Sequence, residues 1–309
     1  MTTHASPPTE NNINKPPKTV IVVGSGVFGA STCRALLETW PSTAVTLIDA
    51  YSFPSPRAAS NDINKIVRAD YADTLYMRMT LDAMERWSGS DPLFAPWYHQ
   101  VGLLRVENRG FSARCLEAFE ALGVTTPAHM IPMSDVRQRW GGIFADGKFG
   151  DVERCYWQPD AGWADADKAL EAVVQDVVDR GVQYREATVD RLTMASEGIC
   201  TGVELEGGEV LTADRVILCT GARTAPLLAN TAPDNKNIQV GNRLFATGAV
   251  TCYARVPEDR WHEFREAPVL SSSLEHIQGK PTVSPHRTPK MLIPPRREHT
   301  AQRRWAHQV

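Results

Sequence analysis

A glycine-rich turn that follows a short β-branched run constrains this chain more than any other feature. Thr19–Val23 reads TVIVV, which is typical of a strand buried on both faces. Gly24, Gly26 and Gly29 follow with the spacing G-x-G-x-x-G, and a helix is predicted over Ala30–Thr39. Such glycines allow a tight turn, close approach of a diphosphate to the backbone, and close packing of the helix on the sheet. The pattern predicts a dinucleotide site at the positive end of a helix dipole.

An acidic residue closes the next predicted strand. Val45–Ile48 is a second buried run, and Asp49 follows it, about 20 residues after Gly29. Its carboxylate would accept hydrogen bonds from a ribose diol and would repel the 2′-phosphate of NADP. This strand–helix–strand unit favours a ligand-binding turn over an unoccupied one, but it does not separate NAD from FAD.

Two later segments bear on that choice. Arg57–Ile66 is a polar loop of small residues, at a point where an NAD enzyme usually enters another crossover helix. Such a loop can pass under an isoalloxazine ring, and the alternative is a solvated connection. Val210–Ala222 predicts a hairpin and a buried strand that ends in Thr220-Gly221, where small residues let the backbone approach a dinucleotide.

Composition excludes several classes of protein. The chain has 309 residues, 42% of them hydrophobic and 22% charged, and its formal net charge is −3. These values are typical of a globular protein and argue against nucleic acid or an anionic membrane as a partner. No stretch has the length of a membrane span or the apolar core of a signal peptide. The six cysteines form no C-x-x-C pair, which argues against a metal site or a disulfide framework, and we expect Cys33 and Cys219 to be reduced core thiols.

Several motifs together carry a family resemblance. They are VIVVGSGVFGAST, LIDAY, SNDINKIVRADYAD, MERW, DPLFAPWYHQVGLLR, PDAGWADADKAL and ADRVILCTGA. The chain resembles the FAD-dependent amine oxidases of the D-amino-acid oxidase and sarcosine oxidase group, and most of all fungal fructosyl amino acid oxidases (amadoriases) and saccharopine oxidases. The similarity runs from about Lys18 to Leu270, and SNDINKI and GWADADKAL are its most specific parts.

The resemblance implies a fold and a chemistry. It implies an α/β fold in which a Rossmann-like FAD-binding domain is interleaved with an α+β substrate domain. Members oxidise an amine beside a carboxylate, pass hydride to flavin N5, and reduce O2 to hydrogen peroxide. The expected partners are therefore a small amine and O2, and we expect a monomer. The location expected is cytoplasmic or peroxisomal, although the last residues, 306–309, match no S-K-L signal.

Site residues follow from the resemblance, position by position. The predicted cofactor-binding residues are Gly24, Gly26, Val27, Phe28, Gly29, Asp49, Ser60, Asn61, Asp62, Lys65, Val189, Thr220 and Gly221. Lys65 is also the candidate catalytic residue, because a cation near the ring stabilises negative charge on reduced flavin; its alternative role is a structural ion pair with Asp62. Arg68 either faces the substrate carboxylate or is an exposed charge. We expect packing roles for His99, Trp157 and Trp163.

The predicted organisation has six segments. They are a disordered tail (1–17), two parts of the FAD-binding domain (18–90 and 161–230), two parts of the substrate domain (91–160 and 231–278), and an irregular, basic, proline-rich tail (279–309). Because the resemblance ends near Ser271–Gly279, we expect an incomplete substrate domain, and non-covalent FAD because no cysteine lies in the family's attachment context. Three hypotheses stay open: an FAD-dependent amine oxidase, a truncated and inactive flavin-binding fragment, and an NAD-dependent dehydrogenase.

Overall fold

The computed structural model describes residues 15–196, 198–247, 250–253, 256–274, 280–284 and 287–293. It divides into two compact units that alternate along the chain. The first unit contains the chain up to Lys65, Arg86–Tyr98 and Ala164–Ala246. The second contains Ile66–Glu85, His99–Trp163 and the chain from Thr247 onward. The interleaving was expected, but the observed boundaries differ from those predicted, because residues 66–85 belong to the second unit and residues 231–246 to the first.

The first unit is built on a four-stranded parallel sheet. Its strand order is β13–β1–β2–β9. The strands are β1 (Thr19–Val23), β2 (Ala44–Asp49), β9 (Gln183–Glu186) and β13 (Arg215–Leu218). In a parallel sheet all carboxyl ends lie along one edge, so the segments after β1, β2 and β13 meet there.

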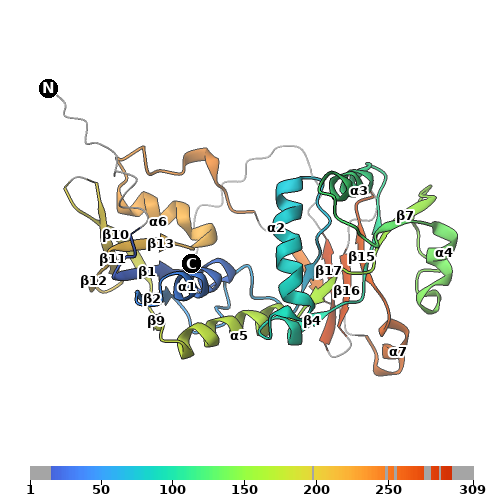
Figure 1. The fold of residues 1–309 in the computed structure, drawn as a ribbon, viewed down its shortest axis with the longest axis horizontal. Helices are drawn as coiled ribbons and strands as arrows, with labels where there is room; N and C mark the ends of the chain where they lie inside the picture. The colour runs from blue at the N-terminus through green and yellow to red at the C-terminus, as the bar shows by residue number, and fades with distance from the viewer. Residues whose placement is uncertain are drawn as a thin grey trace. The chain divides into compact units, whose positions relative to one another are not determined.

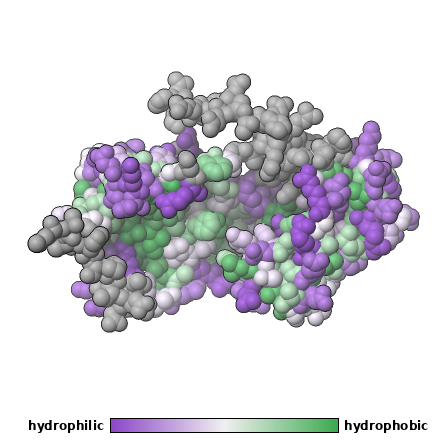
Figure 2. Space-filling view, turned by 90° about the horizontal axis from the view of Figure 1, so that it is seen from above, coloured by the Kyte–Doolittle hydropathy of each residue, from purple (hydrophilic) through white to green (hydrophobic). Residues whose placement is uncertain are grey.

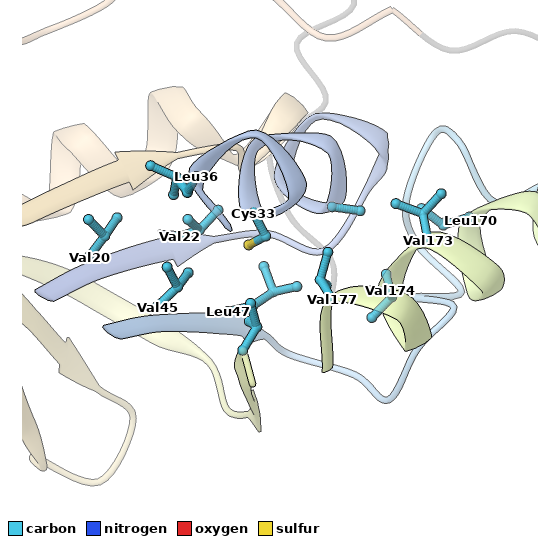
Figure 3. Close-up of a cluster of buried hydrophobic side chains, with 12 residues drawn as sticks. Val20, Val22, Cys33, Leu36, Val45, Leu47, Leu170, Val173, Val174 and Val177 are labelled. Carbon is cyan, nitrogen blue, oxygen red and sulfur yellow. The ribbon is translucent and has the colours of Figure 1, made fainter. Parts of the chain in front are cut away.

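Two helices cover one face of this sheet, α1 (Val27–Thr39) and α5 (Ala166–Asp179) (Figure 1, in blue and yellow-green). Figure 3 shows side chains from the two central strands directed towards Cys33 and Leu36 of α1, with Val177 of α5 beside Leu47. Besides Val177, the cluster contains six buried valines: Val20, Val22, Val45, Val173, Val174 and Val182. This layer holds α1 in place and therefore fixes where its first turn points.

A small antiparallel sheet packs on the other face. Its order is β10–β11–β12, with β10 (Val189–Met194), β11 (Cys200–Leu205) and β12 (Val210–Thr212). Val203 and Leu205 pack against Ile21 and Ile48 of the parallel sheet. Helix α6 (Thr224–Thr231) is joined to β10, because the Leu192 amide donates to Thr231 Oγ1 at 3.0 Å.

The second unit contains two sheets. One has the order β15–β5–β7–β6, and the other is antiparallel with the order β14–β17–β16. The strands are β5 (Leu103–Val106), β6 (His129–Pro132), β7 (Arg154–Gln158), β14 (Val250–Tyr253), β15 (Val269–Ser272), β16 (Lys280–Ser284) and β17 (Arg287–Ile293). The helices are α2 (Thr74–Glu85), α3 (Phe111–Ala121), α4 (Met133–Gln138) and α7 (Trp261–Phe264).

Short elements complete the description. A small three-stranded sheet has the order β3–β8–β4, with β3 (Lys65–Val67), β4 (Tyr98–His99) and β8 (Gly162–Ala164). Single turns of helix occur at Arg86–Ser90, Ala95–Trp97, Trp140–Gly142, Gly221–Arg223, Gly241–Arg243 and Glu258–Arg260.

The two predicted tails fall largely outside the described residues. Of the segment 1–17, the structure describes only 15–17. Of the segment 279–309 it describes 280–284 and 287–293, and these form β16 and β17 instead of an irregular chain. The strands pair with each other, and β17 also pairs with β14, so a distant segment supplies hydrogen bonds that local composition does not reveal.

Figure 2 shows one face of the molecule, on which hydrophobic side chains lie among hydrophilic ones. Exposed hydrophobic side chains include Val27 and Phe28 in the first turn of α1, and Phe28 is 78% exposed. Among the described helices, none is long and apolar enough to cross a membrane.

Candidate functional site

In the turn between β1 and α1, two of the three glycines are required by the fold, because a side chain would not fit at either position. Gly24 has φ +101°, and a Cβ atom there would lie 2.5 Å from the Cys219 carbonyl oxygen. A Cβ atom on Gly29 would lie 1.8 Å from the Gly24 carbonyl oxygen. A Cβ atom on Gly26 would meet nothing closer than Ser60 Oγ, at 3.4 Å. A methyl group at Gly26 would therefore make only ordinary van der Waals contact, so the fold itself does not require a glycine there.

The first turn of α1 is suited to an anion. Gly26 is the N-cap in an extended conformation, supplies no side-chain cap, and no acidic residue follows in the first turn. Amide groups at the start of a helix have no acceptor within the helix, and the dipole makes this end positive. The Val27 amide donates to Ser60 Oγ at 3.0 Å. A helix start whose N-cap residue has no side chain is compatible with a diphosphate, and the diphosphate site stays a prediction.

Asp49 links the ends of two strands. Its Oδ2 accepts a hydrogen bond from the Ser25 amide at 2.8 Å. Its Oδ1 accepts from the Tyr51 amide at 3.1 Å and from Ser55 Oγ at 2.9 Å. A carboxylate has about four acceptor positions, so capacity remains for a sugar hydroxyl.

Tyr184 is a site residue that the sequence did not reveal. It lies in β9, donates its hydroxyl to the Tyr51 carbonyl at 2.6 Å, and contacts Ser25 Oγ at 3.3 Å. Burial raises the pKa of Tyr184 to about 12, so the phenol keeps its proton. Its ring meets Phe53 edge to face. Tyr184 therefore supports the segment after β2. Its neighbours in the sequence (VQYRE) are polar and form no motif.

The polar loop after β2 is fastened to two helices. Ser60 accepts the Val27 amide of α1, and the Asp62 carbonyl accepts the Asp167 amide of α5 at 2.9 Å. Within the loop, the Asn61 amide donates to the Ala58 carbonyl at 2.9 Å. The predicted flavin-facing residues therefore lie between the first turns of α1 and α5.

Lys65 forms the ion pair that was its alternative role. Its Nζ lies 2.7 Å from Asp62 Oδ2, and the lysine side chain is 45% exposed. Partial burial lowers the pKa of the Lys65 ammonium, while the adjacent carboxylate favours its charged form. The ion pair does not exclude a role towards a cofactor, because nearly half of the side chain stays accessible.

The segment after β13 adjoins the glycine turn, while its predicted approach to a dinucleotide stays a prediction. The Cys219 amide donates to the Val23 carbonyl at 2.8 Å, and the Thr220 nitrogen lies 3.3 Å from the position of a Gly24 Cβ. Thr220 Oγ1 lies 2.8 Å from Thr224 Oγ1, and Gly221 has φ +51°. The structure therefore brings both glycine-containing motifs together.

Val189 begins β10, close to the end of β2. The Ala187 amide donates to the Asp49 carbonyl at 2.8 Å, two residues before Val189. The Val189 side chain packs with Val203 and Leu205. A backbone role for Val189 towards the adenine side stays a prediction.

Four other residues named from the sequence belong to the second unit: Arg68, His99, Trp157 and Trp163. Arg68 donates to the Asp70 carbonyl and lies over the Tyr71 ring at 4.4 Å. His99 stacks on Trp163 with 4.0 Å between ring centroids, and Trp157 packs beside Trp140. No group of His, Cys, Asp and Glu suited to a metal ion occurs in the part of the chain that the structure describes.

Comparison with known proteins places this site in a family. The model of the DAO family, described as FAD dependent oxidoreductase, matches residues 19–274. L-saccharopine oxidase from Schizosaccharomyces pombe is 25% identical over 269 residues, which is 82% of this chain and 60% of that protein. Amino acid oxidase fsqB from Aspergillus fumigatus is 27% identical over 250 residues, covering 69% of this chain and 50% of that protein.

Solved structures share the fold. A modified fructosyl peptide oxidase from Aspergillus nidulans superposes with a TM-score of 0.77 at 22% identity, covering 90% of this chain and 64% of that one. An Amadoriase I mutant from Aspergillus fumigatus gives 0.73 at 24% identity, with 90% and 63% covered. The chain thus spans 50–60% of the length of the curated relatives it matches. Because the family model covers most of the chain, including the glycine turn, Asp49 and the segment after β13, the chain belongs to the DAO family of FAD dependent oxidoreductases.

Proposed function

We propose that this chain binds FAD non-covalently at the carboxyl edge of the parallel sheet, with the diphosphate at the first turn of α1. The observation that carries the proposal is a glycine at position 26 that the fold itself does not require, at a helix start whose N-cap residue has no side chain, next to the Ser25 amide that binds Asp49. In this arrangement the amides of α1 hold the diphosphate, and Asp49 accepts a ribose hydroxyl. Lys65 places positive charge on the flavin side of the loop, which stabilises negative charge on a reduced ring.

We further propose that the whole protein oxidises the C–N bond of an amino-acid-derived amine, of the fructosyl amino acid, sarcosine or saccharopine type. The support is the family membership and the names of the relatives, which are oxidases of saccharopine, amino acids and fructosyl peptides. FAD supplies the hydride-accepting and O2-reducing chemistry. The residues of this chain supply the position and the charge around it.

One experiment tests FAD binding first and amine oxidation second. The protein is purified, supplied with FAD, and examined by visible absorbance and by its melting temperature. We expect flavin to stay bound through gel filtration and to be released by denaturation, as non-covalent binding requires. The sample is then assayed for hydrogen peroxide with saccharopine, fructosyl amino acids and sarcosine.

The outcomes separate the remaining hypotheses. Flavin binding followed by peroxide release supports the oxidase. Flavin binding without turnover of any amine leaves only the flavin-binding fragment. A protein that does not bind FAD, but whose melting temperature is raised by NAD, contradicts the proposal and favours the dehydrogenase.

A further inference from the structure

Asp62, in the polar loop, accepts a hydrogen bond at each of its carbonyl and carboxylate oxygens. Its carbonyl oxygen accepts the Asp167 amide of α5 at 2.9 Å. Its Oδ1 accepts the amide of the next residue, Ile63, at 2.9 Å, and its Oδ2 receives the Lys65 ammonium at 2.7 Å. The carboxylate is only 12% exposed, whereas the lysine side chain is 45% exposed. A well-fixed, largely buried acid thus holds a longer and more accessible cation.

We infer that Asp62 is a positioning residue for Lys65: it transmits the position of the first turn of α5 to the lysine ammonium and holds that charge in one place beside the flavin. The inference rests on the proposed function, since Lys65 has a partner to act on only when FAD binds. It changes the role expected for Asp62 from a contact with the cofactor to a contact with the cation.

The physical reason is the flexibility of lysine. A lysine side chain has four rotatable bonds, so its fixation in one place is opposed by the loss of rotamer entropy. An ion pair with a rotationally free, exposed acid would hold it weakly. Here the acid has no such freedom, because its backbone and one carboxylate oxygen are already bound.

An opposing effect makes the inference testable. A carboxylate 2.7 Å from an ammonium also weakens the positive field that reaches beyond the pair. If Asp62 acts mainly as a counter-charge, its removal strengthens the effect of Lys65 on a flavin. If Asp62 acts mainly by positioning, its removal weakens that effect, as removal of Lys65 does.

Sulfite is a suitable probe, because it needs no amine substrate and no turnover. The sulfur lone pair forms a bond to flavin N5, and the displaced electron pair gives negative charge on the N1–C2 carbonyl side of the ring. A fixed cation stabilises that charge, and the visible flavin absorbance falls as sulfite binds. The variants are Asp62→Ala, Asp62→Asn, Lys65→Met and the double variant Asp62→Ala/Lys65→Met, each reconstituted with FAD.

We expect Lys65→Met and Asp62→Ala each to weaken sulfite binding about tenfold or more. The double variant should be no weaker than Lys65→Met alone, because both changes remove the same fixed charge. Asp62→Asn keeps an amide oxygen for the lysine and should fall in between. Asp176→Ala breaks a comparable ion pair on α5, 3.0 Å long, to Arg180, and should leave sulfite binding unchanged.

A second measurement needs no cofactor. Lys65 is acetylated under limiting reagent, and its rate is followed by mass spectrometry of the peptide that contains it. We expect Asp62→Ala to raise the rate about two- to fivefold, as the loss of an ion pair of moderate strength implies. Exposed Lys18 in the same sample should be unchanged and serves as the internal control.

The outcomes distinguish this inference from the proposed function. Tighter or unchanged sulfite binding in Asp62→Ala overturns the inference while FAD binding stands. A wild-type protein that takes up no FAD overturns the proposed function, and the acetylation rates then decide by themselves whether Asp62 holds Lys65. An unchanged acetylation rate in Asp62→Ala also contradicts the inference.

Discussion

Ser25 and Asp49 are joined by a hydrogen bond in which the Ser25 amide donates to Asp49 Oδ2 at 2.8 Å. The bond ties the second residue of the glycine motif to the end of the neighbouring strand. Asp49 Oδ1 accepts two further donors, from Tyr51 and Ser55. The acid that the motif assigns to a ribose therefore also fixes the glycine turn.

The first prediction concerns Asp49→Asn, which is not a conservative change here. An amide has one oxygen, so either Ser25 or the pair Tyr51 and Ser55 would face an NH2 donor in place of an acceptor. We expect a loss of about 2 kcal/mol in the free energy of unfolding and a large loss of FAD affinity. Urea unfolding and fluorescence titration with FAD measure the two effects.

Asp214 offers the matched control for Asp49. Its Oδ2 also accepts two backbone amides, those of Lys18 and Thr19, but at the opposite end of β1. We expect Asp214→Ala to change stability alone and to leave the FAD dissociation constant as it is in the wild type. Equal FAD affinity in Asp49→Asn and Asp214→Ala would contradict a ligand role for Asp49.

The second prediction is that alanine at Gly29 and alanine at Gly26 have different effects. Gly29→Ala places a methyl group 1.8 Å from the Gly24 carbonyl oxygen, so the helix must move away from the turn. Gly26→Ala meets nothing closer than 3.4 Å, and its φ of −68° suits any residue. We expect Gly29→Ala to unfold at a much lower temperature, and Gly26→Ala to melt near the wild type but to lose FAD. A Gly26→Ala protein that binds FAD normally would remove the main support for the proposed site.

Much of the site was predictable because it follows from backbone pairing. Buried β-branched runs predicted the parallel strands, and parallel strands bring Gly24, Asp49 and Thr220 to one edge. Tyr184 and Ser55 were not predictable. Their contacts depend on the path of the loop after β2 and on the edge strand β9, and neither has a hydrophobic pattern.

The sequence predicted individual helices and strands better than it predicted how they pack with one another. Helix α1 begins at Val27, three residues before the predicted start, because the extended conformation of Gly26 makes that residue the N-cap. The periodicity of helix α2 shows which of its faces is buried, and not which core buries it. Met77 packs with Ala118 and Phe119 of α3, so this helix belongs to the second unit.

The third prediction is a pH dependence carried by Asp91. Burial alone raises the pKa of Asp91, but hydrogen bonds from Arg34, the Leu93 amide and Arg86 outweigh it and hold the pKa below its usual value. Arg34 of α1 lies 2.6 Å from the carboxylate. A lowered pKa means that the stability is fully present above the unfolded pKa of about 3.9 and is lost as the pH falls through the folded value.

We expect Asp91→Asn to lower the free energy of unfolding by about 2 kcal/mol at neutral pH. The difference from the wild type should begin to shrink as the pH falls below about 4, where the unfolded chain takes up a proton, and should vanish below the lowered pKa of the folded acid. Urea unfolding at a series of pH values measures this difference. A difference that stays constant down to low pH would assign the effect to packing instead of charge.

The second unit contains a buried ion pair between Asp70 and Arg105, 2.9 Å apart. Asp70 is fully buried and Arg105 is 6% exposed, and the guanidinium lies over the rings of Phe111 and Tyr156. Arg68 provides a second, more distant cation, 3.6 Å from the same Asp70 oxygen. Removal of either partner of a buried pair leaves a charge without compensation.

The fourth prediction is an asymmetry between the two halves of this pair. Asp70→Asn leaves Arg105 and Arg68 facing no anion, and we expect a loss of about 3–5 kcal/mol in the free energy of unfolding. Arg105→Met leaves Asp70 with Arg68 still nearby, so its loss should be smaller. The double variant Asp70→Asn/Arg105→Met should lose less than the sum of the two, because it buries no unpaired charge beside Phe111 and Tyr156. A double-mutant cycle by urea unfolding measures all three, and additive losses would show that the two residues stabilise the unit independently.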